Sequence, residues 1–360
     1  MKKLFLCLAG AVAALTLNAK VWRVNYDENA QADFKTIKEA CSTTLVSDGD
    51  TLYMEPGLHN GSSTDNTISR PLTILGPGWG FQANNGAISA ISQASFANSI
   101  SLKAENITLL GIYAYGISTA NNYEHVYNLR IERCKVSHGI SVGGSYATCQ
   151  NVVIRNNFVQ GDIYVRSYYA ALTHIIIENN IVSNRISGET SCSDKYLIIR
   201  HNTIMGYIQD VSQIIAYDNI ILGGTADPFT FKTTKSNVQI YNNVLSISQD
   251  AYDADLTAVS PKAYSNFPNN IWAGATTKNT FVNQTEGIYF DEAMKYQVRS
   301  DSPAKNAATD GTDCGAFGGE HPFVLYGRPE GIPYIYDVEV PAYPTDNKLN
   351  ISFKVAGQNE

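Results

Sequence analysis

The sequence predicts an all-β fold, a single-stranded parallel β-helix in which the chain winds into stacked coils. A recurring asparagine is the first sign, because it closes five short apolar runs at spacings of 23, 22, 17 and 24 residues: Asn157, Asn180, Asn202, Asn219 and Asn243. Periods of this length are typical of repeat architectures. The second sign is that no helical pattern lies inside the repeat. Each unit is therefore expected to be a strand, a one-residue bend at the asparagine and a second strand.

Apolar residues recur where each coil would face its interior. The first and third residues of the runs are almost all Val, Ile or Leu, as in Val152 and Ile154, and the second residue after the asparagine is apolar again. These positions should stack about 4.8 Å apart. The asparagines are expected to form an inward ladder, to tolerate left-handed backbone angles and to bond to one another between coils. One period upstream, Cys134 holds the ladder place.

The two ends of the chain predict a signal and two caps. Residues 1–19 resemble a secretory signal, with Lys2 and Lys3 before an apolar run. Residues 20–319 are expected to form the β-helix, and an amphipathic helix over 33–41, with Asp33 as its cap residue, should close its N-terminal end. After Ser248 the repeated phrase is lost, so we expect residues 249–299 to form a long loop together with degenerate coils. Period-two runs in 320–360 predict a β-hairpin that packs on the C-terminal end as a second cap.

Several phrases resemble one known family. Residues 33–40, the turn and strand of 49–57 and the asparagine-closed coils are similar to the pectin-lyase-like family of right-handed parallel β-helices, over residues 22–319. Residues 301–307 and 310–318 resemble the closing coil of many exported members. The resemblance implies a right-handed helix. It also implies a family of lyases, hydrolases, esterases, epimerases, tailspikes and members with no known chemistry, so it does not select a reaction.

Composition restricts the partners and the compartment. A net charge of −7 with 16% charged residues and no basic cluster disfavours nucleic acid. No stretch after the signal is long and apolar enough for a transmembrane segment. The protein is therefore expected to be exported, to the periplasm, the cell surface or the extracellular space, with its oligomeric state open. The spacing of its cysteines along the coils predicts lone thiols rather than disulfides.

Outward residues can be aligned on the ladder. The residue three places after the start of each run gives Glu132, Arg155, Glu178 and Arg200, whose alternating charges predict a self-neutralising structural face. The second strand instead combines charges with aromatic rings, which suit sugars. We therefore place the substrate face there, with the substrate-binding candidates Asp162, Tyr168, Tyr169, Glu189, Tyr207, Tyr113 and Tyr115.

A lyase that acts on uronates needs a base and a cation to offset the developing charge. The catalytic candidates for these roles are Arg166, Arg185, Tyr164 and Lys195, with His138 as a further candidate and His201 interpreted as a surface or turn residue. Hydrolysis would need two carboxylates about 5–9.5 Å apart. Asp162 and Glu189 fail this test, because four residues along a strand separate them by roughly 13 Å.

The sequence thus predicts an exported β-helix protein that binds or processes a polysaccharide or oligosaccharide, with a polysaccharide lyase as the favoured enzyme class. The alternative is a non-catalytic glycan-binding or a structural, adhesive surface protein, and the latter would need an apolar stripe along one outer face. The motifs of the family's well-known activities are missing from the sequence. For example, Asp227-Pro228-Phe229 has phenylalanine where the epimerase motif Asp-Pro-His has histidine. No cofactor is predicted with certainty. Ca²⁺ could bind Asp250, Asp253 and Asp255, although a solvated acidic loop explains them better.

Overall fold

A computed structural model describes most of the chain. The described residues are 19–62, 64–79, 94–119, 125–144, 147–167, 172–190, 197–209, 213–223, 229–230, 237–246, 269–272, 274–282, 296–328, 334–339, 343, 348–349 and 351–356. Apart from Ala19, the predicted signal lies outside these residues, as do Asp227, Pro228 and the three aspartates considered for Ca²⁺.

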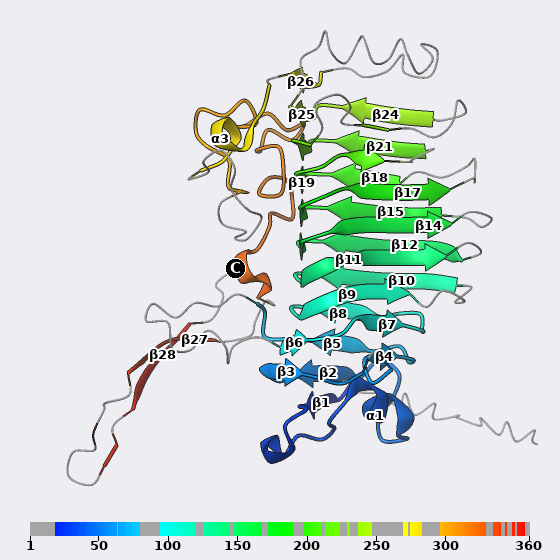
Figure 1. The fold of residues 1–360 in the computed structure, drawn as a ribbon, viewed down its shortest axis with the longest axis vertical. Helices are drawn as coiled ribbons and strands as arrows, with labels where there is room; N and C mark the ends of the chain where they lie inside the picture. Colours follow the sequence, from blue (N-terminus) through cyan, green and yellow to red (C-terminus); the bar gives the residue numbers. More distant parts are fainter. Residues whose placement is uncertain are drawn as a thin grey trace, which may run out of the picture.

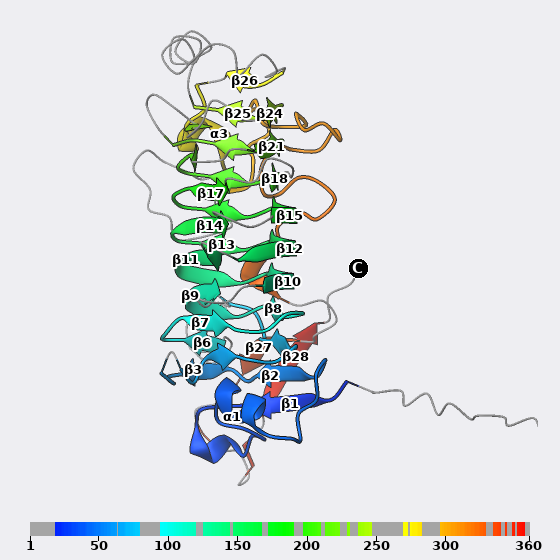
Figure 2. The same ribbon diagram turned by 90° about the vertical axis from the view of Figure 1, so that its right-hand side faces the viewer.

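Parallel strands stack into a solenoid along the long axis of the molecule (Figures 1 and 2). One sheet has the strand order β1 (Val21–Val24), β2 (Thr51–Met54), β5 (Thr73–Leu75), β8 (Thr108–Leu110), β10 (His125–Glu132), β12 (Thr148–Arg155), β15 (Leu172–Glu178), β18 (Leu197–Arg200), β21 (Gln213–Tyr217) and β24 (Asn237–Tyr241). We call it the first sheet. The all-β parallel solenoid predicted from the repeat is confirmed.

The second sheet begins as β3 (Gly57–His59), β4 (Thr67–Ile68), β6 (Ala94–Phe96), β7 (Ile100–Leu102), β9 (Tyr113–Thr119) and β11 (Lys135–Gly144). The long strand β11 then pairs with two shorter series. The inner series follows the ladder: β13 (Phe158–Val159), β16 (Ile181–Val182), β19 (Thr203–Ile204), β22 (Ile220–Ile221), β25 (Val244–Leu245) and β26 (Ile271–Trp272). The outer series is β14 (Asp162–Ser167), β17 (Ile186–Thr190), β20 (Ile208–Gln209) and β23 (Phe229–Thr230).

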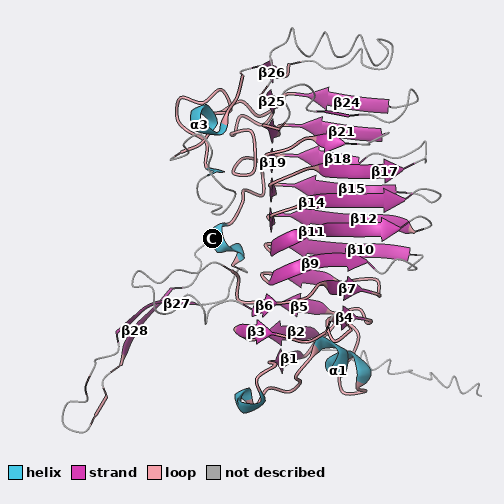
Figure 3. Ribbon diagram, in the orientation of Figure 1, coloured by secondary structure: helices cyan, strands magenta, loops and turns pink. Residues whose placement is uncertain are grey.

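Strands dominate the described chain and helices are short (Figure 3). They are η1 (Glu28–Ala30), α1 (Ile37–Ser42), α3 (Thr277–Thr280) and η3 (Leu325–Gly327). Helix α1 is shorter than predicted, and its cap was assigned to the wrong residue. The Thr36 side chain accepts a hydrogen bond from Glu39 N at 3.1 Å, whereas Asp33 accepts one from Arg23 N of strand β1. Helix α1 buries Ile37 and Ala40 beside the first coils (Figure 1).

The asparagine ladder is present and continuous. Nδ2 of each asparagine donates to Oδ1 of the next, at 3.0 Å from Asn157 to Asn180 and from Asn180 to Asn202, and the series continues through Asn219 and Asn243 to Asn270. The five predicted members are fully buried. At the other end, the Cys134 amide donates to Asn157 Oδ1 at 2.9 Å.

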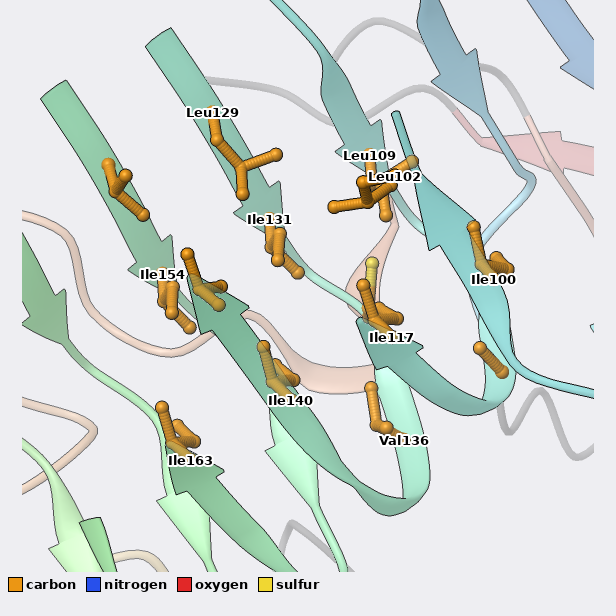
Figure 4. Close-up of a cluster of buried hydrophobic side chains, with 14 of the residues drawn as sticks. Ile100, Leu102, Leu109, Ile117, Leu129, Ile131, Val136, Ile140, Ile154 and Ile163 are labelled. Carbon is orange, nitrogen blue, oxygen red and sulfur yellow. The ribbon is translucent and has the colours of Figure 1, made fainter. Parts of the chain in front are cut away.

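The left-handed residue of each bend was misplaced by one position. The residue before each ladder position has a positive φ, between 50° and 63°: Arg133, Asn156, Asn179, His201, Asp218, Asn242 and Asn269. The left-handed residue turns the chain, so the following asparagine can point inward and bond to its neighbours. Inside the coils, aliphatic side chains from both sheets meet in one core, as Ile131, Ile140 and Ile154 do in Figure 4.

Residues 299–328 do not form the closing coil that their family resemblance implied. They run back along the outside of the solenoid, over the bends, and we call them the return segment (orange in Figure 1). The bends hold it coil by coil. Side-chain nitrogens of Asn242, Asn179, Asn156 and Arg133 donate to the backbone oxygens of Ala307, of Ala316 and Gly318, of His321 and of Arg328, respectively. Side-chain oxygens of Asp218 and Asn156 accept hydrogen bonds from Thr309 and from Val324 N, respectively. This route carries the chain back from the last coils towards the first.

A second apolar cluster lies under the return segment and the nearby chain. It is made by outward side chains of the inner strands, such as Phe158 and Ile220, with Trp79, Phe281 and Phe323. The predicted hairpin exists as the antiparallel pair β27 (Tyr334–Glu339) and β28 (Ser352–Ala356). It follows the return segment and therefore lies beside the early coils rather than on the last ones (Figures 1 and 2).

The described cysteines are thiols, in agreement with the spacing argument. Cys41, Cys134, Cys149 and Cys314 are unpaired, and all but Cys41 are buried. In the part of the chain that the structure describes, no helix has the length and apolar character required to cross a bilayer.

Candidate binding groove

A groove opens on the outer surface of the second sheet, where it crosses strands β9, β11, β14 and β17. Parallel pairing aligns Gly116, Gly139 and Asp162 in one outward column, and Ser118, Ser141, Tyr164 and Ser187 in the column beside it. Because Gly116 and Gly139 carry no side chain, the first column is hollow over two coils. Asp162, which follows Gly139 in this column, and Arg185 on the next coil form the wall of the hollow.

Glycine is required at Gly139 of this floor, whereas a side chain at Gly116 would have to displace a serine hydroxyl. A Cβ on Gly116 would lie 2.9 Å from Ser99 Oγ, and a Cβ on Gly139 would lie 2.6 Å from the backbone oxygen of Asp162. Gly139 also has a φ of +154°, which side chains rarely tolerate. The groove has a volume of ≈ 430 Å³ and is lined by Ser99, Gly116, Ile117, Ser118, His138, Gly139, Ile140, Ser141, Asp162, Tyr164, Arg185 and Ser187.

Tyr115 and His138 form a stacked pair at the edge of the groove. Their ring centroids are 3.7 Å apart, and Tyr115 Oη lies 2.6 Å from His138 Nε2. Tyr115 is 42% exposed, and His138 is exposed as well. The pair offers a ligand both ring surface and a hydrogen-bonding edge.

Asp162 and Arg185 form an ion pair across neighbouring coils. Arg185 Nε donates to Asp162 Oδ2 at 2.9 Å, and the guanidinium also donates to Gln209 Oε1. Asn184 Nδ2 donates to Asp162 Oδ1 at 2.6 Å. The hydrogen bond with Asp162 raises the pKa of Arg185 above its ordinary value, even though burial opposes this. Arg185 therefore stays protonated beside Asp162 through the neutral pH range.

Tyr164 and Arg166 form a second pair on strand β14. Arg166 Nε donates to Tyr164 Oη at 3.1 Å, and the guanidinium carbon lies 5.3 Å from the Tyr164 ring centre. Tyr164 lines the groove, whereas Arg166 is placed next to it and stands opposite Glu189 in the register of β14 and β17. The structure thus brings Asp162, Tyr164 and Arg185 together, with Arg166 beside them.

The remaining candidates divide into three groups. Tyr115 stands at the groove edge, and Tyr207, which hydrogen-bonds Arg185, lies beside the far wall. Tyr113 is on another face, where Ser137 Oγ donates to its hydroxyl at 3.1 Å and its ring joins the cluster under the return segment. Tyr168, Tyr169 and Lys195 lie outside the described residues, and Glu189 is described only by its backbone.

Gly116 and Gly139 are the main features that the sequence reasoning missed. Gly139 stands five residues after Cys134, in the column that holds Asp162 five residues after Asn157. Extending the alignment one coil upstream of Asp162 would have found it. The serines of the neighbouring column could have been found in the same way, since Ser141 is seven residues after Cys134.

The charged column of the first sheet behaves as predicted. Arg155 pairs with Glu132 at 3.3 Å and with Glu178 at 3.7 Å, and Arg200 pairs with Glu178 at 2.7 Å. Glu132 and Glu178 are buried under these arginines. The charges satisfy one another, which fits a structural surface.

His201 was interpreted as a surface or turn residue, and the structure bears out the turn but not the surface position. It occupies a bend, as expected, but the return segment covers it and only 5% of it is exposed. Its Nε2 lies 3.5 Å from Asp218 Oδ2 and 3.7 Å from Asp310 Oδ2. Burial lowers the pKa of His201, although the two aspartates and Glu178 oppose this and only Arg200 acts in the same sense.

Within the described residues, no group of three or more His, Cys, Asp and Glu side chains could hold a metal ion. No family model, curated protein or solved structure matches this chain. Function is therefore argued from the groove and its residues.

Proposed function

We propose that this protein is an exported, pectin-lyase-like right-handed β-helix that binds a polysaccharide in the groove. The groove itself carries the proposal, since it places a hollow floor, an aromatic pair and a charged pair together on consecutive coils. The signal-like residues 1–19 support export. The asparagine ladder supports the family.

Sugars match this arrangement chemically. A pyranose ring has apolar faces that pack on aromatic rings and an edge of hydroxyl groups that exchange hydrogen bonds. The Tyr115 and His138 rings could supply the packing surface, while Asp162 accepts and Arg185 donates. The floor crosses neighbouring coils at about 4.8 Å each. The groove therefore suits a short stretch of an extended chain more than a compact ligand.

A lyase activity is the second candidate. The observation in its favour is the hydrogen bond from Arg166 to Tyr164, because a guanidinium beside a phenol stabilises the phenolate that would act as a base. Arg185 would then have to offset the negative charge that develops on the substrate. Since Arg185 is already paired with Asp162, binding without cleavage remains the better supported function.

A structural or adhesive role has one observation in its favour. Val153, Ile176, Ile198 and Ile215 form an outward, half-buried column on the first sheet. This is the apolar stripe that such a role was expected to need, although flanking side chains partly cover it. A stable oligomer in light scattering that dissociates on Ile198→Lys would favour this role over glycan binding.

Binding is tested with a panel of polysaccharides in affinity electrophoresis and calorimetry. Tyr115→Ala should weaken binding about tenfold, a change of ~1.4 kcal/mol, which is near the upper range for one aromatic contact. Tyr127→Ala is the matched control, because Tyr127 also stacks on a histidine, His125, but on the first sheet. The proposal fails if Tyr115→Ala binds as the parent does, or if both variants lose binding equally. Release of ultraviolet-absorbing unsaturated products would identify a lyase.

A further inference from the structure

We infer that the groove selects an uncharged glycan and rejects uronate and other anionic chains, an inference that rests on the proposed function. A groove that rejects uronates could not hold the substrate of a uronate lyase, so this selectivity would favour binding over lyase chemistry. The charges of the groove carry the inference, because each one already has a partner within the protein.

Arg185, the cation in the groove wall, is already paired within the protein. Arg185 directs Nε to Asp162 Oδ2 at 2.9 Å and another nitrogen to Gln209 Oε1, and it hydrogen-bonds Tyr207 as well. A ligand carboxylate would have to compete for these donors with Asp162. It would also lie beside the negative charge of Asp162, and like charges in a partly desolvated groove repel one another.

The other basic side chains that the structure describes on this face are engaged too. Arg166 is bonded to Tyr164 through Nε and lies near the ring of that tyrosine, outside the groove lining. His138 is bonded through Nε2 to the Tyr115 hydroxyl. An anionic polymer would thus meet a groove whose described basic groups are held by other residues, on a protein whose net charge is −7.

An uncharged sugar can bind without competing with Asp162 for the hydrogen-bond donors of Arg185. The Asp162 and Arg185 pair presents an acceptor next to donors, and neighbouring sugar hydroxyls can donate to the first and accept from the second without breaking the ion pair. In the adjacent column, the hydroxyl groups of the half-exposed Ser118 and the exposed Ser141 can both donate and accept hydrogen bonds. Gly116 and Gly139 line the groove without side chains of their own, so a sugar ring can approach the backbone there.

The experiment compares each neutral polymer with its own oxidised form. Galactan, glucan and mannan are tested beside counterparts whose C6 hydroxyls have been oxidised to carboxylates, so that only charge is added. The parent protein should bind at least one neutral polymer at least tenfold more tightly than its oxidised form, at low and at moderate salt.

Asp162→Asn then tests the cause. The substitution keeps the shape, removes the negative charge and leaves Arg185 without a carboxylate partner, so the preference should shift at least tenfold towards the oxidised polymer. That gain should decline as salt is added. Asp301→Asn is the matched control, because Arg299 and Asp301 form an equivalent ion pair, with two contacts of 2.9 Å, away from the groove. This control should leave the preference unchanged.

The outcomes separate the two proposals. If the parent binds the oxidised polymers as well as the neutral ones or better, and Tyr115→Ala weakens that binding, the groove binds glycans but the inference is wrong. An unchanged preference in a folded Asp162→Asn variant would also overturn it. If no polymer of either kind binds, both proposals fail. The preference of the parent needs no variant, so misfolding of Asp162→Asn cannot hide the answer.

Discussion

Asn180→Leu removes the centre of the asparagine ladder and should cost more stability than any exposed asparagine. Asn180 Oδ1 accepts from both the backbone amide and Nδ2 of Asn157, each at 3.0 Å. Its own Nδ2 donates to Ile154 O at 2.8 Å and to Asn202 Oδ1 at 3.0 Å. All of these groups are buried, so water cannot replace the lost partners.

The magnitude follows from which groups lose their partner. The Asn157 amide N–H loses its acceptor, and an orphaned buried donor costs about 1–3 kcal/mol. Asn157 Nδ2 keeps its bond to Ile131 O, so it contributes only the loss of one ordinary hydrogen bond, about 1 kcal/mol. Leucine has the same number of side-chain heavy atoms as asparagine, branched at the same carbon, so it leaves no cavity. The free energy of unfolding should therefore fall by about 2–4 kcal/mol.

Urea unfolding followed by circular dichroism measures this change, with the slope checked for two-state behaviour. Asn184→Leu is the control, since Asn184 is exposed and its amide bonds to Asp162 Oδ1. The control should change stability by less than about 1 kcal/mol. Equal midpoints for Asn180→Leu and the parent would refute the ladder as a stabilising element.

Three further outcomes are expected. Gly139→Ala should lower stability by about 1–3 kcal/mol, because its Cβ would meet the Asp162 backbone at a φ of +154°, and a parental urea midpoint would contradict this. Burial lowers the pKa of His201 below its ordinary 6.5, so the unfolded chain takes up the proton first and stability should fall as the pH drops below about 6.5. His201→Asn should flatten that part of the curve, and an equally steep curve in the variant would assign the loss to other groups. Burial raises the pKa of Cys134 to about 12, so a thiol reagent near pH 8 should label it only after unfolding, and rapid labelling of the native protein would show that its coil opens.

The regular part of the fold could be predicted because it repeats. Side chains such as Ile154 and Ile177 recur at the coil period, and the ladder asparagines mark the register of each strand. The same alignment predicts that Asp162, Tyr164 and Arg185 share one face, and all three line the groove. Parallel stacking makes such columns a direct consequence of sequence spacing.

The parts that were missed do not repeat. The return segment is held largely through bonds to its backbone, for example from Asn179 to Gly318 across 139 residues, and such bonds leave no pattern in the sequence. Its path also explains why His201 is buried and why Tyr113 faces an apolar cluster instead of the groove. A segment that packs on the outside of a solenoid changes which outward residues are exposed, and the coil period cannot reveal this.

A structure of the protein soaked with the neutral oligosaccharide that it binds most tightly tests the central claim directly. The account predicts a sugar ring over Gly116 and Gly139, in contact with the Tyr115 and His138 pair, with hydroxyl groups bonded to Asp162 and Arg185. Sugar bound instead on the first sheet, for example on the stacked rings of Tyr217 and Tyr241, with the groove empty, would contradict it.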